Sequence, residues 1–519
     1  MFGRVGLVLC ATACALAAAG CDDGGDRSGP SATAQSGARF EEAPCATQPP
    51  ASEPEAVRCG FAVVPTSRTR GTDETVRLAV MILKAEGAPP ADDPVVYVSG
   101  GPGISALRSD LTFFDAWLDI PLQARRDIVI FDQRGTGFSQ PALDCAAEGE
   151  AYRERLAQRL TVDEEWDRSE AIALACGAGL RDRGIDLADY RNAESAADIR
   201  DVMTALGYRA WNIYAFSYGA RVALTAMRDD PRGIRAVVLD SPSPPAGFGA
   251  GRAADLRDAV GRVFRACGED AACAAAYPAP GAALDGVLDA LGREPVTLAS
   301  TSGVTVTITA ERFIDALFRR FGAELFPRLP AEVYAIRGGD RAALQPYADV
   351  LAAGWSGIAS GALISTVCAD DVPFVTSDDV ERGAAGVRAE FVGGVRSFSA
   401  WWPVSVVGGT ANLERARRFC RDWGVPPATT RPDAPVTSAV PAFVMSGAYD
   451  AGEPPSHGAK VAGLLSRSYF LEVPGSGHGV GFRYPLCAGA MAAAFLDAPE
   501  RAPDAACLAG IRPIAWVVP

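Results

Sequence analysis

The segment Trp211-Asn-Ile-Tyr-Ala-Phe-Ser217-Tyr-Gly-Ala220 decides the fold of this 519-residue chain. A short apolar run typical of a buried strand leads directly into a predicted helix over 218–228, and a serine stands between them. The residues two positions to either side of that serine are alanine and glycine, small enough for a sharp strand-to-helix turn. Such a turn holds the serine hydroxyl above the sheet and directs the N–H of the next residue toward a reacting carbonyl, at the positive end of the helix. The segment therefore predicts Ser217 as a nucleophile and Tyr218 as one oxyanion donor.

Apolar runs on both sides of this segment predict a mostly parallel sheet. Pro94–Val98 and Asp127–Phe131 are short and unbroken, as is typical of strands buried on both faces, and Ile234–Leu239 is a further predicted strand. A helix predicted over Ser195–Leu206, with Ser195 as its N-cap, alternates with these strands. This order favours an α/β fold with helices on both faces of the sheet.

The strand-helix alternation stops after residue 245 and resumes near residue 442, where the next strand-like run begins. The residues between are mostly helical in pattern. We therefore expect one α/β core, formed by 41–245 and 431–519, which is divided by a mostly helical cap over 246–430.

The N-terminus has the pattern of an export signal. Arg4 precedes an apolar run that is too short to cross a membrane as a helix, so residues 1–20 are predicted to be a signal peptide. The run ends in Leu16-Ala-Ala-Ala-Gly-Cys21, which resembles the bacterial lipoprotein box, with alanine at the position that usually holds a larger aliphatic residue. Lipidation of Cys21 would anchor the protein at the bacterial cell envelope, whereas ordinary signal cleavage would release it. Residues 21–40, rich in Gly, Ser, Asp and Ala, are expected to form a flexible tether.

Cysteine content supports export independently. Of the 13 cysteines, ten remain once the signal and Cys21 are set aside. An even number in an exported chain is typical of a disulfide framework, and no paired C-x-x-C spacing favours zinc. Connectivity does not follow from sequence alone, and we expect each cysteine to pair with its neighbour along the chain: 45–59, 145–176, 267–273, 368–420 and 487–507.

The formal net charge of -14 argues against a nucleic-acid partner, because binding to phosphates needs a basic face. The sequence has no P-loop and no dinucleotide-binding glycine pattern, so we expect neither a cofactor nor a metal.

Two glycine-rich segments follow predicted strands. In Val98-Ser-Gly-Gly-Pro-Gly103 the glycines allow backbone N–H groups to approach a substrate oxyanion closely, and Gly101 is expected to be the second donor. A plain tight turn is the alternative. In Phe131-Asp-Gln-Arg-Gly-Thr-Gly-Phe-Ser139 we expect Asp132 and Arg134 to brace the loop by ion pairing and hydrogen bonding.

A catalytic serine needs a base, and the chain contains only two histidines. His478 lies in Val473-Pro-Gly-Ser-Gly-His-Gly479, a glycine-rich loop after the last predicted strand, and is expected to be that base. His457 follows the polar segment Glu453-Pro-Pro-Ser and is expected to be a surface residue.

The third member of the triad is an acid that lies between Ser217 and His478 in chain order. Asp450 follows the strand-like run that begins at residue 442 and is expected to fix the tautomer of His478 and to stabilise its cationic form. Asp240 follows the strand predicted at 234–239 and is the alternative acid; its non-catalytic role would be to cap the turn into the helical region.

Gly-Gly-Pro-Gly at 100–103, Asp-Gln-Arg-Gly-Thr-Gly-x-Ser at 132–139 and the Ser217 turn, in this order, resemble the prolyl iminopeptidase and tripeptidyl aminopeptidase family of α/β hydrolases. The resemblance covers roughly residues 45–510 and is thin across the cap. This chain has Ser99 where that family often has a histidine. Further matches are similar to the secreted tripeptidyl aminopeptidase branch: Cys59–Pro65, Ala196–Arg200, Leu239–Pro242 and Val367–Asp370.

The resemblance implies an α/β-hydrolase fold, with Asp450 in the family's Gly-x-x-Asp and a cap that restricts entry to chain ends. It also implies acidic cap residues that hold a free amino terminus. Asp370 and Asp371 match that segment, and a solvated acidic turn is their alternative role.

We therefore expect an exported serine aminopeptidase that acts on a peptide or small acyl substrate. An esterase or lipase-like hydrolase with the same triad is the first alternative. A surface lipoprotein that binds peptides without catalysis is the second. Epoxide hydrolase and dehalogenase chemistry is disfavoured, because those relatives carry aspartate at the position of Ser217.

Overall fold

The computed structural model describes residues 37–49, 56–87, 89–111, 122–245, 249–322, 324–354, 357–399 and 403–519. The predicted signal peptide, Cys21 and most of the predicted tether lie outside these residues. The tether predicted over 21–40 ends before residue 40, because Arg39–Glu42 forms strand β1 and pairs antiparallel with β2 (Val57–Pro65). Within the described ranges, no helix combines the length and the hydropathy needed to cross a membrane.

The core is a nine-stranded sheet, and the predicted α/β-hydrolase fold class is confirmed. Its other strands are β3 (Thr75–Leu83), β4 (Val95–Val98), β5 (Ile128–Phe131), β6 (Trp211–Phe216), β7 (Ile234–Asp240), β10 (Ala442–Gly447) and β11 (Ser468–Val473). The strands stand in the order β1-β2-β3-β5-β4-β6-β7-β10-β11. The strands from β5 to β11 in this order pair in parallel, and the β1–β2, β2–β3 and β3–β5 pairs are antiparallel.

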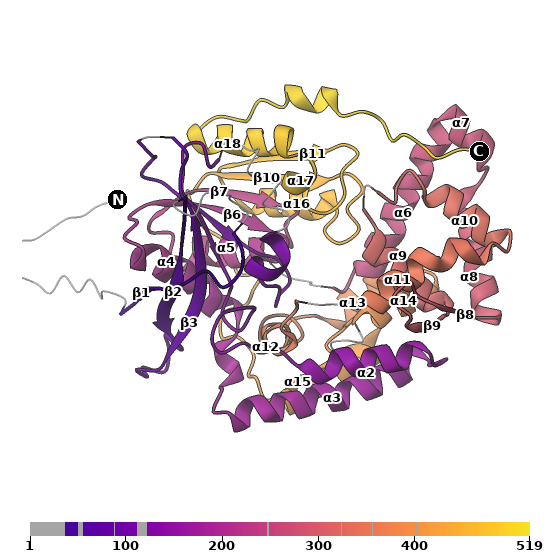
Figure 1. Cartoon of the computed structure of the whole chain (residues 1–519), viewed down its shortest axis with the longest axis horizontal. Helices are drawn as coiled ribbons and strands as arrows, with labels where there is room; N and C mark the ends of the chain where they lie inside the picture. The colour runs from indigo at the N-terminus through magenta and orange to yellow at the C-terminus, as the bar shows by residue number, and fades with distance from the viewer. Residues whose placement is uncertain are drawn as a thin grey trace, which may run out of the picture. The chain divides into compact units, whose positions relative to one another are not determined.

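Helices cover both faces of the sheet (Figure 1). Helices α4 (Asn192–Ala205), α5 (Gly219–Asp229) and α16 (Pro455–Leu464) pack on one face, and α18 (Ala490–Asp497) packs on the other. In β4, Val96 faces the first group of helices and Val95 the second, and both side chains are fully buried. Burial on both faces explains why the run is unbroken in the sequence.

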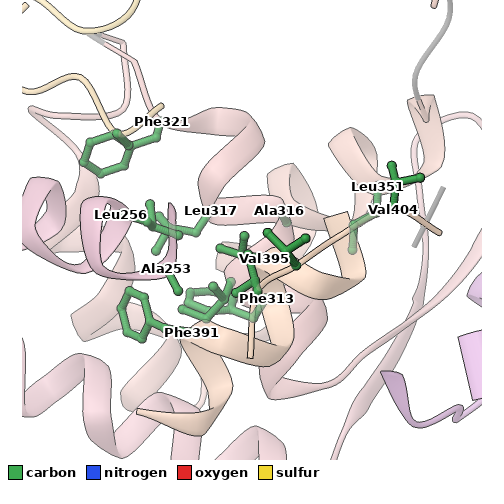
Figure 2. Close-up of a cluster of buried hydrophobic side chains, with 14 of the residues drawn as sticks. Ala253, Leu256, Phe313, Ala316, Leu317, Phe321, Leu351, Phe391, Val395 and Val404 are labelled. Carbon is green, nitrogen blue, oxygen red and sulfur yellow. The ribbon is translucent and has the colours of Figure 1, made fainter. Parts of the chain in front are cut away.

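Residues between β7 and β10 form a helical cap with a hydrophobic core of its own. Figure 2 shows Leu256, Phe313, Leu317 and Val395 in this core. The cap contains α6 (Arg252–Glu269), α7 (Ala271–Ala276), α8 (Pro280–Arg293), α9 (Ala310–Arg320), α10 (Leu329–Arg337), α11 (Gln345–Ala353), α12 (Ser360–Asp370), α13 (Ser377–Ala384), α14 (Ala389–Ser399), α15 (Thr410–Trp423) and a hairpin of β8 (Val296–Ala299) and β9 (Thr305–Ile308).

The cap is larger than the predicted 246–430. Helices α2 (Ala146–Leu156) and α3 (Val162–Asp182) lie between β5 and β6 in the chain, yet they contribute to the same hydrophobic core. Helix α3 lies beside α12 and α15 (Figure 1), and α2 contacts α3, α11 and β9. An ion pair of 2.6 Å between Arg312 and Glu165 joins α9 to α3. The sequence prediction assigned α2 and α3 to the core, because chain order does not reveal which layer a helix packs against.

All five predicted disulfides are present, so the predicted pairing is confirmed. Three of them lie within the helical cap, and the shortest, Cys267–Cys273, joins α6 to α7. Cys145–Cys176 joins the start of α2 to α3, and Cys368–Cys420 joins α12 to α15.

Replacing Cys368 and Cys420 together by serine is expected to lower the free energy of unfolding by about 4 kcal/mol, because the bond closes a long loop and so restricts the unfolded chain. The matched C267S/C273S variant opens a loop of sequence separation 6 rather than 52. It is expected to lose only about 2 kcal/mol. Denaturant unfolding under non-reducing conditions measures both losses, and equal losses would contradict the loop-length argument.

Candidate active site

Ser217 lies in the sharp turn between the end of β6 and the start of α5. Its backbone φ is 54°, a left-handed conformation that costs a non-glycine residue about 1–3 kcal/mol. The Ser217 N–H donates a hydrogen bond of 2.9 Å to the carbonyl oxygen of Asp240, which holds the turn against β7. A Cβ on Gly219 would lie 2.3 Å from the carbonyl oxygen of Val98, so this position must be glycine.

The glycine-rich loop after β4 packs directly against this turn. A Cβ on Gly100 would lie 3.0 Å from the Cβ of Ser217. Gly101 has a φ of 114°, which favours glycine, and it lines the same cavity as Ser217. Tyr218 follows the serine immediately before the first residue of α5. The two expected oxyanion donors, Gly101 and Tyr218, therefore belong to the two segments that meet at Ser217.

A buried network holds the loop where the resembled family often has a histidine. The Ser99 hydroxyl donates to Oδ2 of Asp110 at 2.5 Å, and the Tyr97 hydroxyl donates to the same oxygen at 2.9 Å. Burial raises the pKa of Asp110 to about 6. The side-chain amide of Gln133 donates to the Ser99 carbonyl oxygen at 3.0 Å. Sequence reasoning missed Asp110, because nothing in its local pattern points to Ser99.

His478 and Asp450 form a hydrogen-bonded pair. Nδ1 of His478 lies 2.7 Å from Oδ2 of Asp450, which is fully buried. The other oxygen of Asp450 accepts the N–H groups of Gly452 and Glu453, each at 2.8 Å. Because Nδ1 faces a carboxylate, the neutral ring carries its proton there and leaves Nε2 to accept a proton.

Asp450 also changes the titration of His478. Burial alone would lower the pKa of the imidazole, but the charge and hydrogen bond of Asp450 outweigh it, so that the pKa lies above its usual value. Only the neutral ring accepts a proton. Activity that depends on His478 as a base is therefore lost as the pH falls through this raised pKa.

Asp240, the alternative acid, contacts the backbone of the histidine loop and not the ring nitrogen. Its carboxylate accepts the N–H groups of Val480 and Gly481 at 2.9 and 2.8 Å. The Tyr214 hydroxyl donates to it at 2.8 Å. Asp240 therefore holds the segment that follows His478.

Asp132 and Arg134 brace their loop, as predicted. Arg134 donates to both carboxylate oxygens of the buried Asp198 at 2.7 Å. Asp132 accepts the N–H groups of Leu107 and Phe138 at 2.9 and 2.8 Å. The motif supports the site without lining the cavity around Ser217.

Ser217 and His478 line one cavity of about 320 Å³ between the sheet and the cap. Its walls are mostly aliphatic and aromatic, and its charged lining residues are Arg252, Arg319, Asp371 and Glu453. The apolar walls come largely from the cap, through Phe318, Phe321, Ile358, Leu363, Val367, Val372, Val404, Val406 and Val407.

The two adjacent acids of the cap have different surroundings. Asp370 does not line the cavity: its carboxylate accepts the N–H of Asn192 at 2.8 Å and so caps the start of α4. Helix α4 begins at Asn192, three residues before Ser195, so the N-cap predicted at Ser195 is wrong. Asp371 lines the cavity and forms an ion pair of 2.7 Å with Arg221 of α5. Among the described residues, no hydrogen-bond donor reaches Oδ2 of Asp371, although the side chain is buried.

The second histidine is not the surface residue predicted from sequence. The side chain of His457 is 27% exposed, and Nδ1 lies 2.8 Å from Oε2 of Glu453. Glu453 is itself buried and lines the cavity. The signal was present in the sequence, since a Glu and a His four residues apart share one face of a helical turn, but the surrounding prolines suggested a loop.

Comparison with known proteins relates two segments of the chain to described families. Residues 93–260 match the family described as alpha/beta hydrolase fold, and residues 405–507 match the family described as TAP-like protein. Ser217 lies in the first segment, and Asp450 and His478 lie in the second.

Individual relatives cover the chain to different extents. Serine protease Hip1 of Mycobacterium tuberculosis is 24% identical over 484 residues, which is 89% of each chain. Putative hydrolase YuaR of Escherichia coli is 30% identical over 197 residues, and the aligned segment spans 36% of each chain. Proline iminopeptidase of Mycobacterium smegmatis has a solved structure that aligns over 85% of this chain and 98% of its own, with 15% identity and a TM-score of 0.38.

The different contacts of Asp450 and Asp240 predict different kinetic defects when each is replaced. Asp450→Asn is expected to lower kcat for an activated ester by about 10⁴-fold, because an amide facing Nδ1 favours the wrong tautomer. Asp240→Asn is expected to lower kcat by about 100-fold at most, through a displaced histidine loop. It should also lower the thermal stability, since two buried N–H groups lose a carboxylate acceptor. Steady-state kinetics and thermal unfolding of both variants check this order, and a larger kcat loss in Asp240→Asn would reverse the assignment.

Proposed function

This chain is a serine hydrolase of the α/β-hydrolase family, and from that premise we propose that it is an exported aminopeptidase that releases short N-terminal fragments through an acyl-enzyme on Ser217. Three observations support this proposal: the hydrogen bond between His478 and Asp450, the cavity that Ser217 and His478 line, and the match of the C-terminal segment to the TAP-like family.

In the proposed mechanism, Oγ of Ser217 attacks the scissile carbonyl carbon while Nε2 of His478 takes the hydroxyl proton. The N–H groups of Gly101 and Tyr218 stabilise the oxyanion that forms. His478 then gives its proton to the leaving amine, and the C–N bond breaks to leave an ester on Ser217. Water, deprotonated by His478, attacks this ester, and the serine regains its proton as the fragment leaves. Asp450 stabilises the cationic ring in both halves.

One observation carries the preference for a free amino terminus: Asp371 lines the same cavity as Ser217, and an oxygen of its buried carboxylate has no donor among the described residues. A buried acceptor without a donor costs about 1–3 kcal/mol, and more when it is charged. A substrate ammonium group would supply both the donor and the opposite charge. The pKa of Asp371 is raised by burial, and Arg221 acts against that effect. The apolar walls of the cavity favour uncharged side chains between the amine and the scissile bond.

The decisive test compares chromogenic peptides that have free or acetylated N-termini. We expect turnover of the free peptides and none of the acetylated ones, because acetylation removes the charge that Asp371 would bind. Asp371→Asn is expected to lower kcat/KM for free peptides about 30-fold, equivalent to ~2 kcal/mol, and to lower that for an amine-free ester much less, through the loss of the Arg221 ion pair alone. Asp370→Asn is the matched control, since Asp370 does not line the cavity.

Ser217→Ala must abolish every activity in this panel. Undiminished turnover of acetylated peptides would refute the exopeptidase proposal. Turnover of esters alone would favour the esterase alternative, which uses the same triad. Equal losses in Asp371→Asn and Asp370→Asn would show that the loss arises from the fold and not from amine binding.

We further propose that the protein is exported and lipid-anchored at the bacterial cell envelope through Cys21. The five disulfides support an oxidising compartment, and the segment before Cys21 supports lipoprotein processing. We expect radiolabelled palmitate to be incorporated into the wild-type protein and not into Cys21→Ser when both are expressed in a bacterium. Equal labelling of the two would exclude this anchor, and no labelling of the wild type would favour simple secretion.

A further inference from the structure

Hydrogen bonds connect the triad through residues that take no part in the chemistry. The Ser243 N–H donates to the carbonyl oxygen of Ser217 at 3.1 Å, and the Ser243 hydroxyl donates to Oε1 of Glu453 in a short hydrogen bond. The N–H of Glu453 donates to Asp450, the partner of His478. Glu453 therefore connects the nucleophile turn to the acid loop.

The carboxylate of Glu453 is in turn held by His457. Oε1 accepts from Ser243, and Oε2 lies 2.8 Å from Nδ1 of His457. The Glu453 side chain is only 4% exposed, so its negative charge depends on these neighbours for stabilisation. His457 stands at the start of α16, where it lies between the core and the cap.

We propose that His457 is a positioning residue for the triad, acting through Glu453 on the Asp450–His478 pair and on the Ser217 turn. It does not line the cavity, so its effect reaches the reaction through the carboxylate that it holds. The inference rests on the proposed triad and is independent of the preference for peptides.

The charged groups that face His457 favour its cationic form. Glu453 contacts Nδ1, Asp255 of α6 lies 3.9 Å from Nε2, and Arg252 of α6 lies 3.7 Å from Glu453. Burial and Arg252 lower the pKa of His457, but Glu453 and Asp255 outweigh them, so that the pKa is raised. The cation is present below this raised pKa and is lost as the pH rises through it. The support that His457 gives to the triad should therefore weaken as the pH rises above the pKa of His457. Activity at low pH is limited instead by protonation of His478.

The test compares His457→Ala and His457→Asn with the wild type on a small activated ester. His457→Ala is expected to lower kcat about tenfold with KM unchanged, because the Asp450 loop loses its support without loss of a substrate contact. The kcat of His457→Asn should fall less, since the asparagine amide can donate to Glu453 from the position of Nδ1. Lys460→Ala, an exposed change on the same helix, is the matched control and should behave as the wild type.

The rate at which a fluorophosphonate labels Ser217, measured from pH 5 to pH 10, gives a readout that does not depend on the substrate. We expect an alkaline decline in the wild type that is absent from His457→Asn, while the acidic decline remains in both. A change confined to KM, or a wild-type labelling profile in folded His457→Ala, would overturn the inference. If His457→Ala fails to fold, His457→Asn decides alone. A wild type that is never labelled would instead refute the triad itself.

Discussion

The carboxyl end of β7 is the point on which the geometry of the site depends. The backbone carbonyl of Asp240 accepts the N–H of Ser217, while its carboxylate accepts the N–H groups of Val480 and Gly481. One residue thus joins the Ser217 turn to a loop that lies 240 positions further along the chain. Because a central strand of a buried sheet has little freedom to move, these bonds preorganise the loops before any substrate enters. An unpaired carboxylate in the same place would be costly, and the backbone donors are what make its burial tolerable.

The cap is fixed to this core by buried charge as well as by apolar packing. Arg221 of α5 and Asp371 are 1% and 2% exposed at their side chains and lie 2.7 Å apart. A buried ion pair adds little net stability, because desolvation offsets most of the attraction, but removing one partner is costly. The pair therefore specifies where the cap sits more than how stable it is. It links α5, which follows the Ser217 turn, with the segment that ends α12.

The sequence was informative wherever a feature is local. The unbroken run of β4 and the small residues beside Ser217 each follow from a short stretch of chain. The features that it could not supply depend on partners that are distant in sequence. Asp370 caps α4 through a hydrogen bond to Asn192, 178 positions away, so the start of that helix was misplaced. The location of α2 and α3 in the cap was missed for the same reason.

Asp370 and Asp371 show that long-range contacts can give two neighbouring residues different surroundings. Asp370 is the last residue of α12 and Asp371 follows it with a non-helical backbone, so that one acid contacts the start of α4 and the next lines the cavity. Which acid takes which direction depends on the rotation of α12 about its axis. Cys368, two residues before Asp370, binds Cys420 of α15 and so restricts that rotation. The disulfide therefore bears on which charge the cavity presents, and not only on the stability of the cap.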